Sequence, residues 1–372
     1  MASSRLRAQV LPRALLLLTA VSGFSAVAAP APTPQADPQM QKVLDAYQAL
    51  NPKPLETLQP AEAREGPSAT DAVEAVLKQE GKAAAPEKVA RVEERKIPGP
   101  AGELDVRVYT PEGSGPFPGV VYFHGGGFVL ADLETYDASA RALANQAQAV
   151  VVSVHYRQAP ENRFPAALDD AQAAFQYVQS HAKNFNIDAK RVAIAGESAG
   201  GNLATAVAMR QVKQKGAVPV FQLLIYPFVS NDLSTPSHQR NGGGEYLVSN
   251  EALGWFWRNT LGSNWRKTRN AEALPLQATP RQLKGLPPAL VMVASLDPLL
   301  DEGIAYADKL KAAGVKVDVK RYDGVTHEFF GMAPVVDKAK RAQTDAGVAL
   351  RKAFSAQGIG GSGEEAEEAE ER

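Results

Sequence analysis

One serine in the chain lies between two glycines in a pattern that could make it a nucleophile. Residues 196–200 read Gly-Glu-Ser-Ala-Gly; the apolar stretch RVAIAG leads into Ser198, and the helical NLATAVAMRQV follows it. A G-x-S-x-G sequence between a strand and a helix is typical of a sharp turn that exposes the serine hydroxyl above a sheet. A serine that only caps a helix is the alternative. The strand-turn-helix setting favours the nucleophile.

A serine hydroxyl reacts only when a base accepts its proton and an acid orients that base. Of the five histidines, His327 lies in RYDGVTHEFFG, directly after the last expected strand, and is the best candidate for the base. The acid should also follow a strand, and Asp297, after ALVMVASL, fits best, with Asp301 and Asp323 as competitors. Packing or solvent exposure is expected of His155, His181 and His238. The order serine, aspartate, histidine is the one that an α/β-hydrolase arrangement requires.

A run of three glycines could bind the negative charge that develops in this chemistry. Acyl transfer to a serine places a transient charge on the former carbonyl oxygen, and preformed N–H donors stabilise it. One donor is expected from Ala199, directly after the nucleophile, and others from a glycine-rich loop that follows an earlier strand. The stretch VYFHGGGF, in which His124 precedes Gly125, Gly126 and Gly127, is such a loop. A phosphate loop is excluded because no G-x-x-x-x-G-K-[ST] pattern occurs.

Alternating strands and helices are expected to position these residues. The clearest helical pattern begins at Pro165 and places Leu168, Ala171, Phe175 and Val178 on one stripe. Seven mostly apolar segments read as strands of a sheet buried on both faces. They are LDVRVYT, GVVYF, AVVVSVHY, RVAIAG, FQLLIYP, ALVMVAS and VKVDVKRY. This alternation predicts an α/β fold with a mostly parallel, doubly wound sheet.

Several separate blocks resemble the hormone-sensitive-lipase-like branch of the α/β-hydrolases, the bacterial family IV esterases with an HGGG motif. The blocks are HGGGF, YRQAPE with FPAA, GESAGGN, GLPPALV with DPLLDEG, and THEFFGM, between about residues 106 and 354. The resemblance implies an α/β-hydrolase fold with a helical cap. It also implies that Gly126 and Gly127 donate to the oxyanion and that Asp297 is the acid. His124, beside Gly125, would brace the glycine loop rather than transfer protons.

Two residues depart from the usual pattern of that family. Glu197 precedes the candidate nucleophile, where the family more often has Asp or Thr, and Glu328 follows the candidate base, where many members have Gly. Neither belongs to the triad or to the oxyanion donors. Both are therefore expected to affect specificity rather than activity.

The chain divides into four expected parts. A signal peptide, residues 1–28, precedes a Pro-rich spacer and N-terminal cap helices over 29–98, and the hydrolase core follows over 99–355. Inside the core, residues 229–275 form a cap insertion. The last part, 356–372, is rich in glutamate and poor in apolar residues, and is expected to be a disordered tail, with a docking tail as the alternative.

An aromatic segment of the insertion is expected to cover the site. The segment EALGWFWRNTLG reads as an aromatic helix, and the insertion contains no good strand. A long insertion in a compact domain is either disordered or functional, and its tryptophans favour a folded cover. We therefore expect Trp255 and Trp257, together with Phe128 after the glycine run, to line the substrate pocket.

The N-terminus predicts export. Arg5, Arg7 and Arg13 precede a short apolar stretch that ends in Ala26-Val27-Ala28, a pattern typical of a signal peptide cleaved near Ala28. The chain is then expected in the periplasm or outside the cell, without a stable membrane anchor after cleavage. An uncleaved anchor is the alternative, although the apolar stretch is shorter than the roughly 20 residues that span a bilayer.

Composition excludes several classes of partner and site. Lys and Arg (40) nearly balance Asp and Glu (41), and no long basic run occurs, so no nucleic-acid partner is expected. The chain has no cysteine, which excludes disulfides and thiolate metal sites. It also lacks paired histidines at helical spacing. Neither a metal nor a cofactor is therefore expected.

These observations together predict a serine carboxylesterase. Its partner would be a small-molecule ester with a small or short acyl chain, hydrolysed through an acyl-enzyme intermediate. Amide or lactone hydrolysis, or lipase activity, by the same triad is the alternative. A non-catalytic ligand-binding protein on this fold is a further alternative, although such proteins usually lack a member of the triad. The sequence specifies no oligomeric state.

Overall fold

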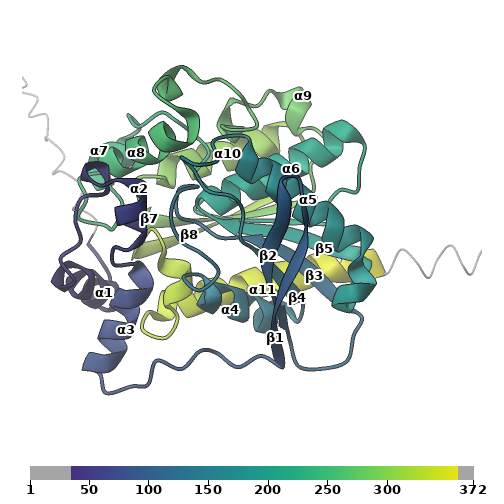
Figure 1. The fold of residues 1–372 in the computed structure, drawn as a ribbon, viewed down its shortest axis with the longest axis horizontal. Coiled ribbons are helices and arrows are strands. Elements are labelled where there is room, and N and C mark those ends of the chain that lie inside the picture. The colour runs from purple at the N-terminus through teal and green to yellow at the C-terminus, as the bar shows by residue number, and fades with distance from the viewer. Residues whose placement is uncertain (1–34, 359–372) are drawn as a thin grey trace, which may run out of the picture. The chain divides into compact units, whose positions relative to one another are not determined.

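An eight-stranded sheet forms the centre of the fold, in the order β1-β2-β4-β3-β5-β6-β7-β8 (Figure 1). The computed structural model describes residues 35–358. Strand β2 runs antiparallel to both neighbours, and every other neighbouring pair is parallel. The strands are β1 (Arg91–Gly99), β2 (Gly102–Thr110), β3 (Phe117–Phe123), β4 (Val150–Val154), β5 (Ile187–Glu197), β6 (Gln222–Ile225), β7 (Ala289–Leu296) and β8 (Val317–Thr326). The predicted α/β fold with a mostly parallel sheet is confirmed.

Of the strands in the described residues, β1 is the one that the sequence pattern did not predict. It lies within the part expected to hold only a spacer and cap helices, so the sheet begins at Arg91, ahead of the predicted core boundary at residue 99. Its sequence, RVEERKIPG, is mostly polar because β1 pairs only with β2, at the edge of the sheet, and leaves most of its side chains exposed. An edge strand needs no continuous apolar run.

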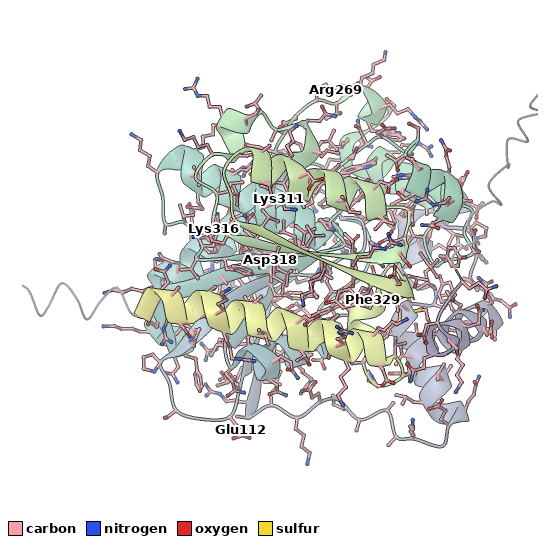
Figure 2. The ribbon with its side chains drawn as sticks, turned by 180° about the vertical axis from the view of Figure 1, so that it is seen from behind. Glu112, Arg269, Lys311, Lys316, Asp318 and Phe329 are labelled. Atoms are coloured by element: carbon pink, nitrogen blue, oxygen red, sulfur yellow. The ribbon has the colours of Figure 1, made fainter. Side chains whose placement is uncertain are left out.

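Helices cover both faces of the sheet. Helices α5 (Ala166–Ser180), α6 (Ala199–Gln214) and α10 (Leu300–Ala312) pack on one face, and α4 (Asp137–Ala147) and α11 (Asp337–Gly358) on the other. Figure 2 shows α10 and α11 running along opposite sides of β8. Strands β4 and β7 are buried along their whole length, which explains their unbroken apolar sequences.

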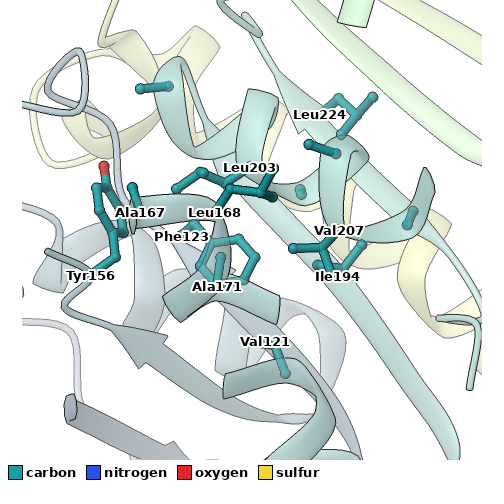
Figure 3. Packing of buried hydrophobic residues seen from close by; sticks show 14 of the residues in the cluster. Val121, Phe123, Tyr156, Ala167, Leu168, Ala171, Ile194, Leu203, Val207 and Leu224 are labelled. Carbon is teal, nitrogen blue, oxygen red and sulfur yellow. The ribbon is translucent and has the colours of Figure 1, made fainter. Parts of the chain in front are cut away.

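The close-packed layer between the sheet and its helices fixes the position of Ser198. Leu168 and Ala171 of α5 lie against Phe123 of β3 and Leu203 of α6 (Figure 3). All four side chains are buried. Truncating a buried leucine to alanine in such a core typically costs about 2 to 5 kcal/mol, so this layer holds β3 and α6 firmly against each other.

Two segments from distant parts of the sequence form a cover beside the sheet. The first contains α1 (Pro38–Ala49), a 3₁₀ turn (Leu55–Thr57), α2 (Pro60–Arg64) and α3 (Ala69–Gln79). The second contains α7 (Pro236–Asn241) and α8 (Asn250–Leu261), within the predicted cap insertion. A hydrogen bond of 3.2 Å from Trp255 Nε1 of α8 to the carbonyl oxygen of Leu58 joins the two segments.

The remaining helical pieces are short. The 3₁₀ turns span Ala182–Phe185, Trp265–Lys267, Pro275–Gln277 and Phe329–Met332, and helix α9 spans Pro280–Leu283. Within residues 35–358, no helix has the length and apolar character needed to cross a membrane. The predicted signal peptide lies outside the described residues, as do residues 359–372 of the predicted tail.

Candidate active site

Ser198 occupies the sharp turn between β5 and α6. Its backbone has φ 54° and ψ −117°, a conformation that costs strain for a residue with a side chain. The turn depends on its flanking glycines. A Cβ on Gly196 would overlap the carbonyl oxygen of Gly200, and a Cβ on Gly200 would overlap that of Phe123 on β3. The strand and helix therefore cross as closely as the G-x-S-x-G pattern indicates.

The structure brings Ser198, His327 and Asp297 into one hydrogen-bonded chain. His327 Nε2 lies 2.9 Å from Ser198 Oγ, and His327 Nδ1 lies 2.7 Å from Asp297 Oδ2. The other oxygen, Asp297 Oδ1, accepts a bond of 2.8 Å from the N–H of Leu299. Because an ionised carboxylate only accepts, His327 carries its proton on Nδ1 and presents Nε2 to the serine hydroxyl.

The two competing aspartates lie elsewhere. Asp301 is in the first turn of α10, where its Oδ2 accepts a bond of 2.7 Å from the N–H of Ser237. Asp323 is exposed on β8 and pairs with Arg321 at 2.7 Å.

The cap insertion holds the loop that carries Asp297. From α7, Asn241 Nδ2 donates to the carbonyl oxygens of Asp297 (3.0 Å) and Ser295 (3.2 Å). Ser237 Oγ, also from α7, donates to the carbonyl oxygen of Pro298 at 2.6 Å. These bonds fix the backbone on both sides of the acid. No pattern in the sequence indicates this role of α7.

The glycine loop after β3 faces the same site. Gly126 and Gly127 have φ of 87° and 60°, in the left-handed region that favours glycine. A Cβ on Gly126 would overlap the carbonyl oxygen of Leu130, and one on Gly127 would overlap the ring of Phe256. Both glycines line the cavity that contains Ser198 and His327, and Ala199 begins α6 directly after Ser198.

His124 is fully buried next to this loop and is not among the residues that line the cavity. Its ring stacks on Tyr156 with centroids 4.4 Å apart, and Nδ1 lies 2.9 Å from the carbonyl oxygen of Gly125. The Tyr156 hydroxyl donates to the carbonyl oxygens of both His124 (2.9 Å) and Gly125 (3.0 Å). Burial lowers the pKa of His124 to about 3, so the ring is neutral at ordinary pH.

Two further carboxyl groups lie close to the histidine of the triad. Glu197 is fully buried and accepts hydrogen bonds from the hydroxyls of Tyr122 (2.6 Å) and Tyr226. Burial and the neighbouring Glu328 raise the pKa of Glu197 to about 7, against the effect of the tyrosine hydrogen bonds. Glu328 Oε1 lies 3.7 Å from His327 Nε2, and burial raises the pKa of this carboxyl as well.

These carboxyl groups set the proton affinity of His327. Burial alone would lower its pKa, but Asp297, Glu328 and Glu197 raise it, and the net direction is above the ordinary value. The imidazolium form of His327 is thus stabilised from both ring edges, by Asp297 at Nδ1 and by Glu328 near Nε2.

A cavity of about 1140 Å³ opens onto Ser198 and His327. Leu58 and Val73 line it from the N-terminal segment, and Phe256 lines it from α8 of the insertion. Both segments of the cover therefore form walls of the candidate substrate site. Such a volume slightly exceeds the range of about 300 to 1,000 Å³ that is usual for small-molecule sites.

The aromatic residues expected in the substrate pocket require a correction. Phe128 and Trp257 do not line this cavity; they line a separate void of about 20 Å³. Trp255 donates to Leu58 and joins the two parts of the cover. On a helix, adjacent residues point about 100° apart, so it is Phe256, between the two tryptophans, that faces the glycine loop.

Two contacts near the site lacked a sequence signal that would identify them. Arg64 of α2 donates to the carbonyl oxygens of Val129 (2.8 Å) and Ala159 (2.9 Å) and binds Glu161 through two bonds of 2.8 Å. It thereby ties the cover to the glycine loop. Tyr136 donates to Glu328 Oε2 at 2.6 Å. Because almost two hundred residues separate the two in the sequence, no local sequence pattern predicts this contact.

The described part of the chain offers no cluster of three or more His, Cys, Asp or Glu side chains that could hold a metal ion. The chemistry available at the site is that of an activated serine, a histidine base and backbone N–H donors.

Comparison with known proteins places the chain in a family. Residues 120–331 match the family model described as alpha/beta hydrolase fold. Esterase LipI of Mycobacterium tuberculosis is 42% identical over 264 residues, which cover 70% of this chain and 82% of that protein. Ethyl acetate hydrolase of Pseudomonas putida is 38% identical over 242 residues, 63% of this chain and 74% of the relative.

Solved structures agree with this assignment. A thermostable esterase from Pseudomonas putida superposes with a TM-score of 0.78 and 35% identity, over 87% of this chain and 99% of that one. A hyperthermophilic esterase from Pyrobaculum calidifontis superposes with a TM-score of 0.77, also at 35% identity, over 86% of this chain and 98% of that one. The chain therefore belongs to the hormone-sensitive-lipase-like branch of the α/β-hydrolase family and is a carboxylic ester hydrolase of that family.

Proposed function

We propose that the chain is a serine carboxylesterase that works through an acyl-enzyme on Ser198. The observation that carries the proposal is the hydrogen-bonded chain from Ser198 Oγ through His327 to Asp297. In the first step His327 Nε2 accepts the serine proton while Oγ attacks the ester carbonyl. His327 then gives this proton to the departing alcohol, and Asp297 orients the ring and stabilises its charged form.

The negative charge of the tetrahedral intermediate is assigned to backbone N–H groups. Gly126 and Gly127 adopt positive φ beside Ser198, and Ala199 begins a helix there. Removing one such donor typically costs about 3 to 4 kcal/mol of transition-state stabilisation. His124, neutral and stacked on Tyr156 under the loop, braces the donors and takes no part in proton transfer. Water, activated by the same histidine, then releases the acid.

The proposed substrates are small or short-chain carboxylic esters. The name of one relative, ethyl acetate hydrolase, supports this class. The test is hydrolysis of p-nitrophenyl esters from C2 to C16 by the wild type and by Ser198→Ala. We expect the highest kcat/KM at short chains and a loss on the order of a millionfold in Ser198→Ala.

An exposed serine provides the control for this test. Among residues 35–358, Ser180 on the surface of α5 hydrogen-bonds only within its own helix turn and to His181. Ser180→Ala should therefore retain full activity. Equal rates for the wild type and Ser198→Ala would refute the proposal. A maximum at long chains, with a rise at the substrate's solubility limit, would indicate a lipase, and a preference for lactones or amides would change the substrate class.

We also propose that the protein is exported. The support is the arginine-rich start, the short apolar stretch and the Ala26-Val27-Ala28 site in the sequence. Fractionation of cells that express the full chain tests the proposal. A mature protein that begins near Ala29 in the periplasm or medium is expected, and an uncleaved protein in the cytoplasm would contradict it.

A further inference from the structure

The carboxylate of Glu328 lies beside the atoms that would handle the leaving alcohol. Its Oε1 is 3.7 Å from His327 Nε2, the atom that lies 2.9 Å from Ser198 Oγ. The side chain lines the cavity and is 22% exposed, so a ligand in the cavity can reach it. Tyr136 donates to the other oxygen, Oε2, at 2.6 Å and leaves Oε1 directed toward the reacting atoms.

The chain keeps this carboxylate at a position where the backbone favours glycine. Glu328 has φ 66°, in the left-handed region, which strains any residue with a Cβ. Backbone strain at a site persists only where the surrounding structure enforces it, and it often accompanies function. The Tyr136 hydrogen bond supplies part of that enforcement. The chain therefore places a carboxylate beside the reacting atoms even though the backbone of Glu328 is strained.

The walls of the cavity carry more acidic than basic side chains. Nine glutamates and aspartates line it, against five lysines and arginines. Lys53, Arg107 and Arg141 pair with four of these acids, Glu62, Glu94, Glu134 and Asp137, and Arg64 pairs with Glu161. Among the described residues this leaves five lining glutamates and one lining lysine, Lys340, outside such ion pairs. An excess of negative charge in a concave site concentrates field lines and attracts cations.

The same cavity offers aromatic surfaces. Tyr136, Phe228 and Phe256 all contribute to its lining. Aromatic faces attract ammonium groups through the ring quadrupole, and they suit methylated ammonium groups in particular. A carboxylate together with aromatic walls is a combination that binds a bulky cation better than a neutral group of the same shape.

From this geometry we infer that the site prefers esters whose alcohol carries a quaternary or tertiary ammonium group, and that Glu328 determines this preference. The inference rests on the proposed esterase mechanism. The departing oxygen must lie next to His327 Nε2 to receive its proton, and a cation two carbons away from that oxygen then lies near Glu328 Oε1.

A pair of isosteric substrates tests the preference. Butyrylcholine carries a trimethylammonium group, and 3,3-dimethylbutyl butyrate carries a neutral tert-butyl group of nearly the same shape. Burial raises the pKa of Glu328, so the comparison is made at pH 8, where more of its carboxyl is ionised than at lower pH. We expect kcat/KM there to favour the choline ester by about fivefold. Glu328→Gln and Glu328→Gly should both bring this ratio close to one.

Glu62 supplies the matched control. Its side chain lines the same cavity but is exposed and paired with Lys53 at 2.8 Å. Glu62→Gln makes the same change from carboxylate to amide, but at a carboxylate whose charge Lys53 already neutralises. It should leave the ratio of the two kcat/KM values unchanged. Using a ratio of two substrates at one pH removes any effect that Glu328 exerts equally on both through His327.

The outcomes separate the two proposals. A wild-type ratio of one or less overturns the preference, and a high ratio that both Glu328 variants retain overturns its assignment to Glu328. If no neutral ester is hydrolysed in a Ser198-dependent way, the esterase mechanism fails and the inference falls with it.

Binding provides a measurement that needs no turnover. Calorimetry with choline should show weaker binding to Ser198→Ala/Glu328→Gln than to Ser198→Ala, and equal affinities would overturn the inference.

Discussion

His327 is the residue at which the electrostatics of the site converge. Asp297 hydrogen-bonds to one ring nitrogen, and Glu328 lies near the other. The buried carboxyl group of Glu197, whose own pKa is raised to about 7, also raises the pKa of His327. Only the first of these carboxyl groups belongs to the expected triad. The other two, the residues that depart from the family pattern, extend the control over His327.

This arrangement has a consequence for the pH dependence of the rate. The base must be neutral to accept the serine proton, and the pKa of His327 is raised above its ordinary value of 6.5. The acid limb of kcat/KM for p-nitrophenyl butyrate should therefore have its midpoint above pH 6.5. Glu328→Gln removes one of the charges that raise the pKa and should move the midpoint to lower pH, whereas Glu62→Gln should not. A midpoint below 6.5, or one unmoved in Glu328→Gln, would contradict this explanation.

Glu197 should make the stability of the protein depend on pH. Its pKa is about 7 in the folded chain, against 4.5 ordinarily, so the folded state holds a proton that the unfolded state releases between these values. The free energy of unfolding should fall as the pH rises through this range. Glu197→Gln removes this titration, so we expect its stability relative to the wild type to rise by about 2 to 3 kcal/mol between pH 5 and pH 8. Urea denaturation at both pH values measures the difference; an equal difference at both would refute it.

The triad could be predicted from the sequence because each member follows a strand, and parallel strands deliver their ends to one edge of the sheet. The direction of a side chain has no such signature. Nothing in the sequence shows that Tyr136 reaches Glu328, or that Phe256 rather than Trp255 faces the glycine loop. The unpredicted part of the site is thus the part that depends on contacts between distant segments.

At the level of elements, the glycine loop is confined between its own backbone and α8. Gly126 accepts bonds at its carbonyl oxygen from the N–H groups of Val129 (3.0 Å) and Leu130 (2.8 Å), which closes a tight turn. Phe256 of α8 contacts the space where a Cβ of Gly127 would lie. The cap helix therefore helps to hold the N–H donors in place, in addition to forming a wall of the cavity.

A substitution at Gly127 tests this confinement. Gly127→Ala would introduce a Cβ that overlaps Phe256 at a residue with φ 60°. The loop must shift, and we expect kcat for p-nitrophenyl butyrate to fall on the order of a hundredfold as one oxyanion donor is displaced. Gly314→Ala is the control, because Gly314 also has positive φ but the described part of the chain places no atom within 4 Å of the added Cβ. It should cost about 1 to 2 kcal/mol of stability and no activity. Equal activity of the two variants would show that α8 does not confine the loop.

At the scale of the whole molecule, the N-terminal helices belong to the core as much as to the cover. Met40 and Val43 of α1 are fully buried, in the same cluster as residues of the sheet and of α11. The Asp37 N–H donates to the carbonyl oxygen of Gly324 at 2.7 Å, and Thr326 Oγ1 donates to Met40 Sδ at 3.6 Å. These contacts fall on the end of β8, directly before His327.

The sequence predicted the two helical segments and the insertion from their periodicity and from the interruption of the strand pattern. It did not predict that α1 packs under the end of β8, because an amphipathic face shows that a helix is partly buried but not against which partner. The polar edge strand β1 was not predicted for the converse reason. Backbone pairing with β2 holds it in place, so it needs little apolar burial of its own.

Two truncations test how far the fold depends on the N-terminal helices. A chain that starts at residue 81 lacks α1 to α3 and with them the burial of Met40, Val43 and Val76. Losing that burial costs several kcal/mol, at about 1.5 to 3 kcal/mol for each large apolar side chain, and we expect Tm to fall by at least about 10 °C. Activity should fall with it, since the end of β8 loses its contacts beside His327. A chain that starts at residue 35 retains every contact described above and should match the full chain in Tm and kcat/KM. If the shorter chain were equally stable and active, α1 to α3 would be a dispensable cover rather than part of the structure that positions the histidine.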